Sequence, residues 1–162
     1  MNNKALKGAP AALGRRFGAV AVAAAAGIAG AGTASAAEHV VQMLNQGASG
    51  PMVFEPDFLK VDVGDTVVFQ PVQRGGHNSQ SSYVPDGAKP WTSPPDTEYK
   101  VEMNVEGVYV YVCQPHLVMG MAGVIQVGNA VNLDAATAAA TQASTGFVMN
   151  KDRLSTALAK VQ

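Results

Sequence analysis

The residues of this chain with the richest chemistry lie in "VCQPHLVMGMAG", residues 112–123. Cys113 is the only cysteine, and His116 and Met121 follow it in the pattern C-x2-H-x4-M. Thiolate, imidazole and thioether form a soft, mixed ligand set that suits copper cycling between Cu(I) and Cu(II). Zinc prefers four thiolate, imidazole or carboxylate ligands, and this chain supplies too few of them. The alternative is that Cys113 is a small buried hydrophobic residue, as free cysteines often are.

A trigonal copper site of this kind needs one more nitrogen donor, and the chain offers His39 and His77. His77 lies in "RGGHNSQ", where glycines allow the backbone to turn tightly and approach a site closely. Asn78 can hydrogen-bond locally and connect this loop to the cysteine loop. His39 lies in an alternating segment, where a solvent-facing histidine is expected. We therefore predict His77 as the additional ligand.

Short strands must position these residues. The segments 39–44, 52–72, 98–103, 107–113 and 123–128 are alternating or rich in β-branched residues, with turn residues between them. Residues 73–97 are polar and too long for a hairpin loop, so we expect a functional loop or a short helix there. About seven strands without an intervening helix predict an all-β Greek-key sandwich or barrel.

The C-terminal part of the chain has a different pattern. Residues 132–144 and 151–162 are rich in alanine, with Asp134 and Asp152 near the expected helix starts and Lys160 near an end. This charge placement favours helices through their dipoles. We predict two short helices that pack on the sandwich, so that residues 130–162 extend the domain formed by residues 37–129.

Residues 1–36 have the features of a cleaved signal peptide. Four basic residues precede or flank an apolar run rich in Gly and Ala, and "ASA" at 34–36 fits a signal-peptidase site with Ala37 as the mature start. A transmembrane anchor is the alternative, but the run is short for a membrane span. The two adjacent arginines are compatible with both twin-arginine and Sec export.

Removal of this segment changes the charge balance. The whole chain has 11 basic and 12 acidic residues, and four of the basic and none of the acidic ones lie in 1–36. The remaining 126 residues therefore carry 7 basic and 12 acidic side chains, a net charge of −5. An acidic chain of this length indicates one domain and argues against nucleic acid as a partner. A single cysteine excludes an internal disulfide.

The exported segment resembles the pseudoazurins, which are small type 1 (blue) copper proteins of the cupredoxin family. The likeness rests on "VQMLNQGASGPMVFEPDFLKVDVGDTVVFQPV", "GHN", "CQPHLVMGMAG" and the paired C-terminal helices. The resemblance implies a cupredoxin-like Greek-key β-sandwich that holds one copper ion. It further implies that His77, Cys113 and His116 are equatorial ligands, Met121 is the axial ligand, and Asn78 hydrogen-bonds between the two ligand loops.

Three further residues are placed near the site by this resemblance. Met119 would complete the shorter C-x2-H-x2-M spacing of amicyanin-like cupredoxins, but the "MGM" pair matches the pseudoazurins, in which the second methionine binds. Met52 corresponds to a pseudoazurin methionine near the copper-binding loops. Its side chain would either contact the His116 ring or simply pack in the core. Pro115 stiffens the loop and, lacking an N–H, removes one donor to the cysteine sulfur.

The implied activity is transfer of single electrons between periplasmic redox proteins. Electrons would pass through the edge of His116 within an apolar surface that includes Leu117 and Met119. The resemblance suggests copper nitrite reductase or a c-type cytochrome as partner of a monomer without a membrane anchor. Many pseudoazurins carry a ring of lysines, whereas this chain has Gln46 and Val112 at two such positions, which puts the reductase in doubt.

Two other classes of function are less compatible with the sequence. A copper enzyme would need histidines for a second copper centre, and only His39 remains after the ligands are assigned. A copper storage or delivery protein is the alternative, and the Met119–Met121 pair is compatible with it. Delivery sites are usually open, however, so a thiolate that is buried favours retention of the metal.

Overall fold

A computed structural model describes residues 36–162, and the predicted signal peptide lies outside the described residues apart from Ala36. Eight strands, one 3-10 helix and two α-helices occur in this part of the chain. In chain order they are β1 (Glu38–Gly47), β2 (Gly50–Glu55), β3 (Phe58–Val61), β4 (Thr66–Pro71), β5 (Gln80–Tyr83), β6 (Tyr99–Glu102), β7 (Gly107–Val112), η1 (Leu117–Met119), β8 (Ala122–Val127), α1 (Leu133–Ser144) and α2 (Arg153–Leu158).

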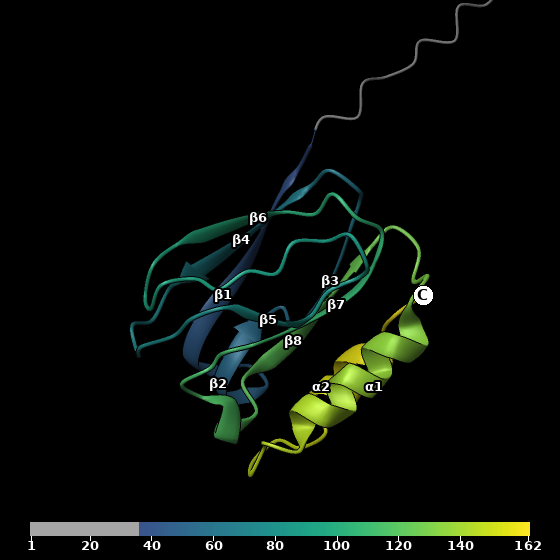
Figure 1. The fold of residues 1–162 in the computed structure, drawn as a ribbon. Helices are drawn as coiled ribbons and strands as arrows, with labels where there is room; N and C mark the ends of the chain where they lie inside the picture. The colour runs from purple at the N-terminus through teal and green to yellow at the C-terminus, as the bar shows by residue number, and fades with distance from the viewer. Residues whose placement is uncertain (1–35) are drawn as a thin grey trace, which may run out of the picture. The chain divides into compact units, whose positions relative to one another are not determined.

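The strands form two four-stranded sheets that pack face to face. One sheet has the order β2-β1-β4-β6 and the other β3-β8-β7-β5. β1 pairs with β4 and β3 pairs with β8 in parallel, while the other strand pairs are antiparallel. The two C-terminal helices lie side by side along the outer face of the second sheet (Figure 1). The predicted β-sandwich with two short C-terminal helices is therefore confirmed.

The central strand β7 is buried on both of its faces, which explains its continuous run of large β-formers. Because side chains alternate along a strand, Tyr109 and Tyr111 point into the core between the sheets. Val108, Val110 and Val112 point the other way and pack against the helices. The helices thus cover a second hydrophobic core and close the outer face of the sheet that carries Cys113.

Two local features are more specific than the sequence-based expectation. The 73–97 segment contains the strand β5 and no α-helix; the sequence "QSSY" lacks the hydrophobic alternation by which strands are recognised, and the strand is formed by pairing with β7. The second helix, predicted within 151–162, is only the six residues of α2. None of the helices described in residues 36–162 is long and apolar enough to cross a membrane.

Candidate metal centre

His77, Cys113 and His116 come together at one end of the sandwich. His77 lies in the loop after β4, Cys113 directly follows β7, and His116 directly precedes η1. One potential ligand atom from each of the three lies within 4.8 Å of the other two. His77 and Cys113 are fully buried, whereas His116 is half-buried. The structure therefore joins the distant histidine to the Cys–His loop.

The hydrogen bonds of His77 define which ring nitrogen faces the centre. Nε2 lies 2.8 Å from Oδ1 of Asn45, which can only accept, so Nε2 carries the proton. The Nδ2 group of Asn45 in turn donates to the carbonyl of Arg74 at 3.1 Å, which fixes the amide in this orientation. Nδ1 of His77 is buried without a hydrogen-bond partner. Burial, followed by the nearby His116, lowers the pKa of His77, so its imidazole is kept neutral with a free lone pair.

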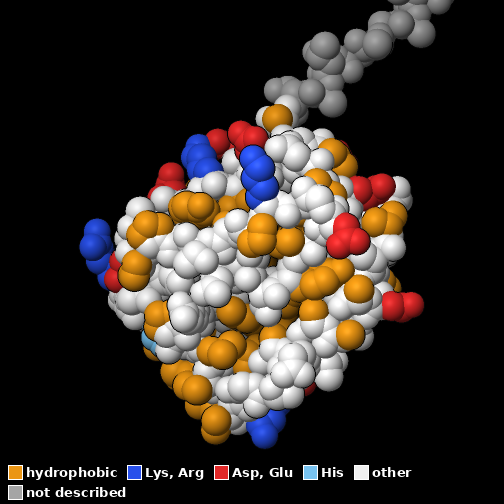
Figure 2. Space-filling view, in the orientation of Figure 1, with side chains coloured by type: hydrophobic (Ala, Val, Ile, Leu, Met, Phe, Trp, Pro, Cys, Tyr) orange, Lys and Arg blue, Asp and Glu red, His pale blue; other side chains and the backbone are white. Residues whose placement is uncertain are grey.

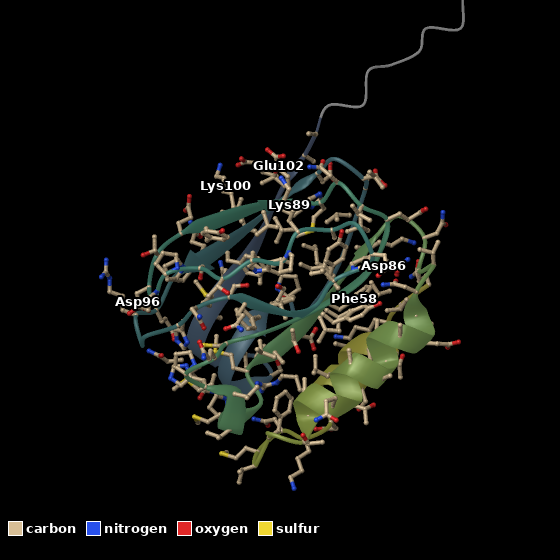
Figure 3. The ribbon with its side chains drawn as sticks, viewed as in Figure 1. Phe58, Asp86, Lys89, Asp96, Lys100 and Glu102 are labelled. Atoms are coloured by element: carbon tan, nitrogen blue, oxygen red, sulfur yellow. The ribbon has the colours of Figure 1, made fainter. Side chains whose placement is uncertain are left out.

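The loop that carries His77 is held by Asp96. The Asp96 carboxylate accepts backbone N–H bonds from Gly75, Gly76 and His77, with distances of 2.9–3.2 Å, and these bonds lower the pKa of Asp96. Figure 3 shows Asp96 at the left edge of the molecule. Gly75 allows the close approach, because a Cβ there would collide with the side chain of Asn45. The Asp96 carboxylate thus holds the backbone from Gly75 to His77.

Cys113 is connected to the same loop through Asn78. The Asn78 backbone N–H points at Cys113 Sγ at 3.4 Å, and the Asn78 side-chain oxygen accepts the backbone N–H of Gln114 at 2.8 Å. Nδ1 of His116 also lies 3.4 Å from Cys113 Sγ. Burial raises the pKa of the Cys113 thiol, so a thiolate at this position needs a neighbouring cation such as a metal ion.

Met121 is held next to these residues by the backbone. Its carbonyl accepts the N–H of Cys113 at 2.8 Å, and its own N–H donates to the carbonyl of His116 at 3.3 Å. Its side chain is fully buried. Met119 lies in η1 and is half-buried. The burial of Met121 agrees with the ligand role predicted for it, which stays a prediction together with the roles of His77, Cys113 and His116.

The other residues predicted near the site occupy three different environments. Met52 is half-buried, packs against the core between the sheets and has a left-handed backbone with φ of 49°. Pro115 is exposed in the loop before His116. Leu117 is half-buried against the helices rather than open to solvent. The exposed hydrophobic residue of η1 is Val118, whose side chain the sequence analysis did not single out.

Sequence analysis also missed Asn45 and Asp96, which bond directly to His77 and its loop. Neither belongs to a local motif, because each is about twenty or more positions away from His77 in the chain. The only available signal was the "GG" pair before His77, which indicates a tight approach of the backbone to another group. The third histidine, His39, lies near the start of β1 and bonds to Asp65 in the turn before β4. It does not join the cluster.

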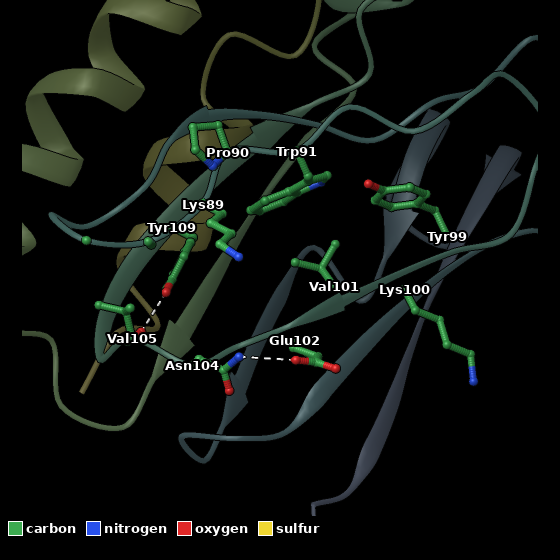
Figure 4. A pocket seen from close by; sticks show the side chains of 12 residues that line it. Lys89, Pro90, Trp91, Tyr99, Lys100, Val101, Glu102, Asn104, Val105 and Tyr109 are labelled. Atoms are coloured by element: carbon green, nitrogen blue, oxygen red, sulfur yellow. Dashed lines mark hydrogen bonds between the residues drawn. The ribbon is translucent and has the colours of Figure 1, made fainter.

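A cavity of about 420 Å³ lies elsewhere, between the 87–91 loop and β6. Trp91, Tyr99 and Tyr109 contribute aromatic rings to its lining, which also includes Lys89 and Lys100 (Figure 4). Figure 3 shows Lys89, Lys100 and Glu102 at the upper edge of the molecule and Asp96 at its left edge. None of the proposed ligands lines this cavity.

The donor set fits copper on two grounds. Two imidazoles and one thiol converge from rigid loops, which is the nitrogen and sulfur combination of type 1 sites. Leaving a buried imidazole nitrogen without a partner is costly, and ligation of a metal would satisfy Nδ1 of His77. The chemistry of the cluster therefore matches a mononuclear copper ion.

Comparison with known proteins gives the same assignment. Residues 41–128 match the model of the family "Copper binding proteins, plastocyanin/azurin family". A putative pseudoazurin of Rhizobium leguminosarum bv. viciae is 48% identical over 122 residues, which cover 74% of this chain and 79% of that protein. The pseudoazurin of Paracoccus pantotrophus is 42% identical over 123 residues, which cover 74% and 84% of the two chains.

A solved structure agrees with these sequence relatives. The crystal structure of native pseudoazurin from Hyphomicrobium denitrificans superposes with a TM-score of 0.65 at 37% identity, covering 77% of this chain and 98% of that one. Together, the family model, the relatives and the convergence of His77, Cys113 and His116 assign the fold and the metal. This chain belongs to the pseudoazurins, within the plastocyanin/azurin family of copper-binding proteins.

Proposed function

We propose that the protein carries single electrons between redox proteins through one type 1 copper ion held by His77, Cys113, His116 and, axially, Met121. The observation that supports this most directly is the convergence of two imidazoles and one buried thiol in loops joined by hydrogen bonds. A copper ion bound there supplies a Cu(I)/Cu(II) couple. A carrier of this kind makes and breaks no substrate bond, so we propose no enzymatic activity.

The protein's own contribution is to keep these ligands in place. Asn45 orients the ring of His77, Asp96 holds its backbone, and Asn78 ties its loop to the residue after Cys113. Ligands fixed in this way move little when the charge of the metal changes, which keeps the cost of each electron transfer low. The Asn78 N–H that points at the cysteine sulfur also stabilises negative charge there.

Electrons would enter and leave through the half-buried ring of His116, within an apolar surface. Pro115, Val118 and Met119 surround it in the loop, and the segment between α1 and α2 adds Val148 and Met149. The N–H groups of both of these residues donate to the carbonyl of Val118, at 2.8 and 3.1 Å. Figure 2 shows hydrophobic side chains at this end of the molecule, where η1 and the α1–α2 segment lie in Figure 1. Small apolar contacts of this kind favour brief encounters between redox partners.

We further propose that the protein is exported to the periplasm as residues 37–162, after removal of the signal peptide, and acts there as a monomer. The partner is a periplasmic redox protein such as a c-type cytochrome or copper nitrite reductase. Val112, one of the positions at which a lysine would be expected from the resemblance, is buried against the helices. A lysine-based docking ring is therefore not formed at that position.

A copper titration of the exported protein tests the proposal, with visible absorption and EPR as readouts and Met121→Ala and Met119→Ala as paired variants. We expect an intense blue thiolate-to-copper band that reductant bleaches reversibly and that the Met121 change alters more than the Met119 change. Rapid loss of copper to a chelator would favour storage or delivery instead. A colourless protein, or a band that does not require Cys113, would contradict the electron-carrier function.

A further inference from the structure

The first residues of the folded domain are bound to the turn before β4. The backbone N–H of Ala37 donates to Asp65 Oδ1 at 2.8 Å, and the Ala37 carbonyl accepts the N–H of Thr66 at 2.8 Å. Glu38 then begins β1 opposite Thr66. Ala36 is exposed and lies outside the strand. Within residues 36–162, backbone pairing with the sandwich thus begins at Ala37.

Asp65 is a buried acidic residue with unusually many donors around it. Only 7% of its surface is exposed. Besides Ala37, its carboxylate accepts the N–H of Asp62 at 3.1 Å and lies 2.7 Å from Nε2 of His39. The bond from Ala37, and then those from His39 and Asp62, lower the pKa of Asp65, so it is ionised at neutral pH. Buried carboxylates are normally paired with a cation, and no lysine or arginine forms an ion pair with Asp65 in the described residues.

Signal-peptide processing can supply a cation in addition to His39, which is charged only when it is protonated. The "ASA" pattern at 34–36 predicts cleavage of the Ala36–Ala37 bond, and the nitrogen of that bond is the one that faces Asp65. We propose that Asp65 is the binding site for the α-ammonium group that signal-peptide cleavage creates at Ala37. This inference goes beyond electron transfer and depends on export, not on copper.

The chemistry of this step is hydrolysis by signal peptidase. Water adds across the Ala36–Ala37 peptide bond, Ala36 leaves as a carboxylate, and Ala37 retains the nitrogen, which takes up a proton at neutral pH. The bond to Asp65 then changes from a neutral donor on a carboxylate to an ion pair with charge-assisted hydrogen bonding, which is roughly twice as strong. Processing therefore stabilises the start of β1 on the sandwich.

The location of the site allows only one register for the new terminus. A chain cleaved one residue earlier would place its ammonium group on exposed Ala36, and one cleaved later would lose the nitrogen that contacts Asp65. Near Ala37 and Asp65 lie two other titratable groups, His39 on the same strand as Glu38 and Asp62 in the turn. Glu38 forms an ion pair with Lys100, and Glu102 lies opposite Thr66 in the sheet. The proposed copper ligands lie toward η1, at the other end of the sandwich (Figure 1).

Thermal unfolding of the precursor (residues 1–162) and of the exported, processed protein tests the proposal, each as wild type, Asp65→Asn and Asp62→Asn. Asp62 is the matched control, because it is exposed in the same turn and only its backbone touches Asp65. Mass spectrometry should show that the processed chain begins at Ala37. At pH 7 we expect the processed form to melt about 3–5 °C above the precursor, a difference lost in Asp65→Asn and retained in Asp62→Asn.

A second measurement needs no variant, in case Asp65→Asn does not fold. NMR titration of the Ala37 α-amino group in the processed protein should give a pKa above the ordinary value of about 7.7. The added stability would then be present below that value and be lost as the pH rises through the raised pKa. A different first residue, an ordinary α-amino pKa, or a difference in melting temperature that Asp65→Asn leaves unchanged would each overturn the proposal. Blue colour is expected in all processed variants, so failure here is separable from failure of the copper site.

Discussion

At the scale of single residues, the orientation of His77 depends on a partner far away in the sequence. Asn45 accepts the Nε2 proton of His77 and thereby turns Nδ1 toward Cys113 and His116. Residues that orient a metal-ligating histidine typically contribute about 10- to 100-fold to metal affinity. We therefore expect Asn45→Ala to weaken copper binding by about that factor, because the ring loses both its tautomer preference and its fixed position.

Competition with a copper chelator measures this effect. Gln46→Ala is a suitable control, because Gln46 is the next residue in β1, is exposed, and hydrogen-bonds to Gln73 and Gly47. An affinity of the Asn45 variant equal to that of the Gln46 variant would show that the hydrogen bond does not position the ring.

Two tyrosines on the same strand provide a second comparison between residues. The hydroxyl of Tyr111 is buried without a hydrogen-bond partner, whereas that of Tyr109 donates to the carbonyl of Val105 at 2.6 Å. Tyr109→Phe should lower the free energy of unfolding by about 1 kcal/mol, while Tyr111→Phe should leave it unchanged or raise it by about 1 kcal/mol. Urea denaturation of the two variants checks the order, and a larger loss for Tyr111→Phe would contradict it.

At the scale of elements, the sequence predicts those parts of the fold that depend on short-range patterns. β7 and β8 are recognisable because they are rich in valine, isoleucine and tyrosine, and α1 because alanines follow Asp134. The Cys113–His116 spacing is equally local. β5, by contrast, owes its strand conformation to pairing with β7, and the bonds from Asn45 and Asp96 to the His77 loop join positions 19 to 32 residues apart. No periodicity or motif within a short window contains such contacts.

Arg153 shows how a C-terminal helix can act on the metal loops. This buried residue of α2 donates through Nη1 to the carbonyls of Met52 and Gly120, at 2.6 and 2.8 Å. Nη2 lies 3.4 Å from the carbonyls of Ser49 and Pro51. The guanidinium thus joins α2 to the β1–β2 turn, to the start of β2, where Met52 has a left-handed backbone, and to the residue before Met121.

We expect Arg153→Met to lower the free energy of unfolding by about 2–4 kcal/mol, because it fills the space but leaves buried carbonyls without donors. It should also change the visible and EPR spectra of the copper protein, since Gly120 directly precedes the proposed axial ligand Met121. Lys151→Met, a change on an exposed residue two positions earlier, is the control. Unchanged spectra in an Arg153→Met protein that still folds would limit the role of the arginine to stability.

At the scale of the whole molecule, the two segments proposed to form the docking surface around His116 carry no charged side chain. Residues 37–162 carry 7 basic and 12 acidic side chains. None of them lies in the ligand loop 113–121 or in the segment 145–150, which supply Val118, Val148 and Met149. An uncharged docking surface gains little from long-range steering, which requires a cleft or patch of one charge sign.

Electron exchange with a c-type cytochrome should therefore depend weakly on salt. Between about 20 and 200 mM ionic strength we expect the bimolecular rate constant to change by less than about threefold, whereas steered pairs change by about tenfold or more.

Val118→Glu should lower the rate at every ionic strength, because it places a charge that must be desolvated within the apolar contact. Ala135→Glu, on the exposed start of α1, adds the same charge outside the docking surface and should leave the rate nearly unchanged. Stopped-flow kinetics of the three proteins separate the two effects: a steep salt dependence of the wild-type protein, or equal rates for the two variants, would mean that the partner binds to another, charged face.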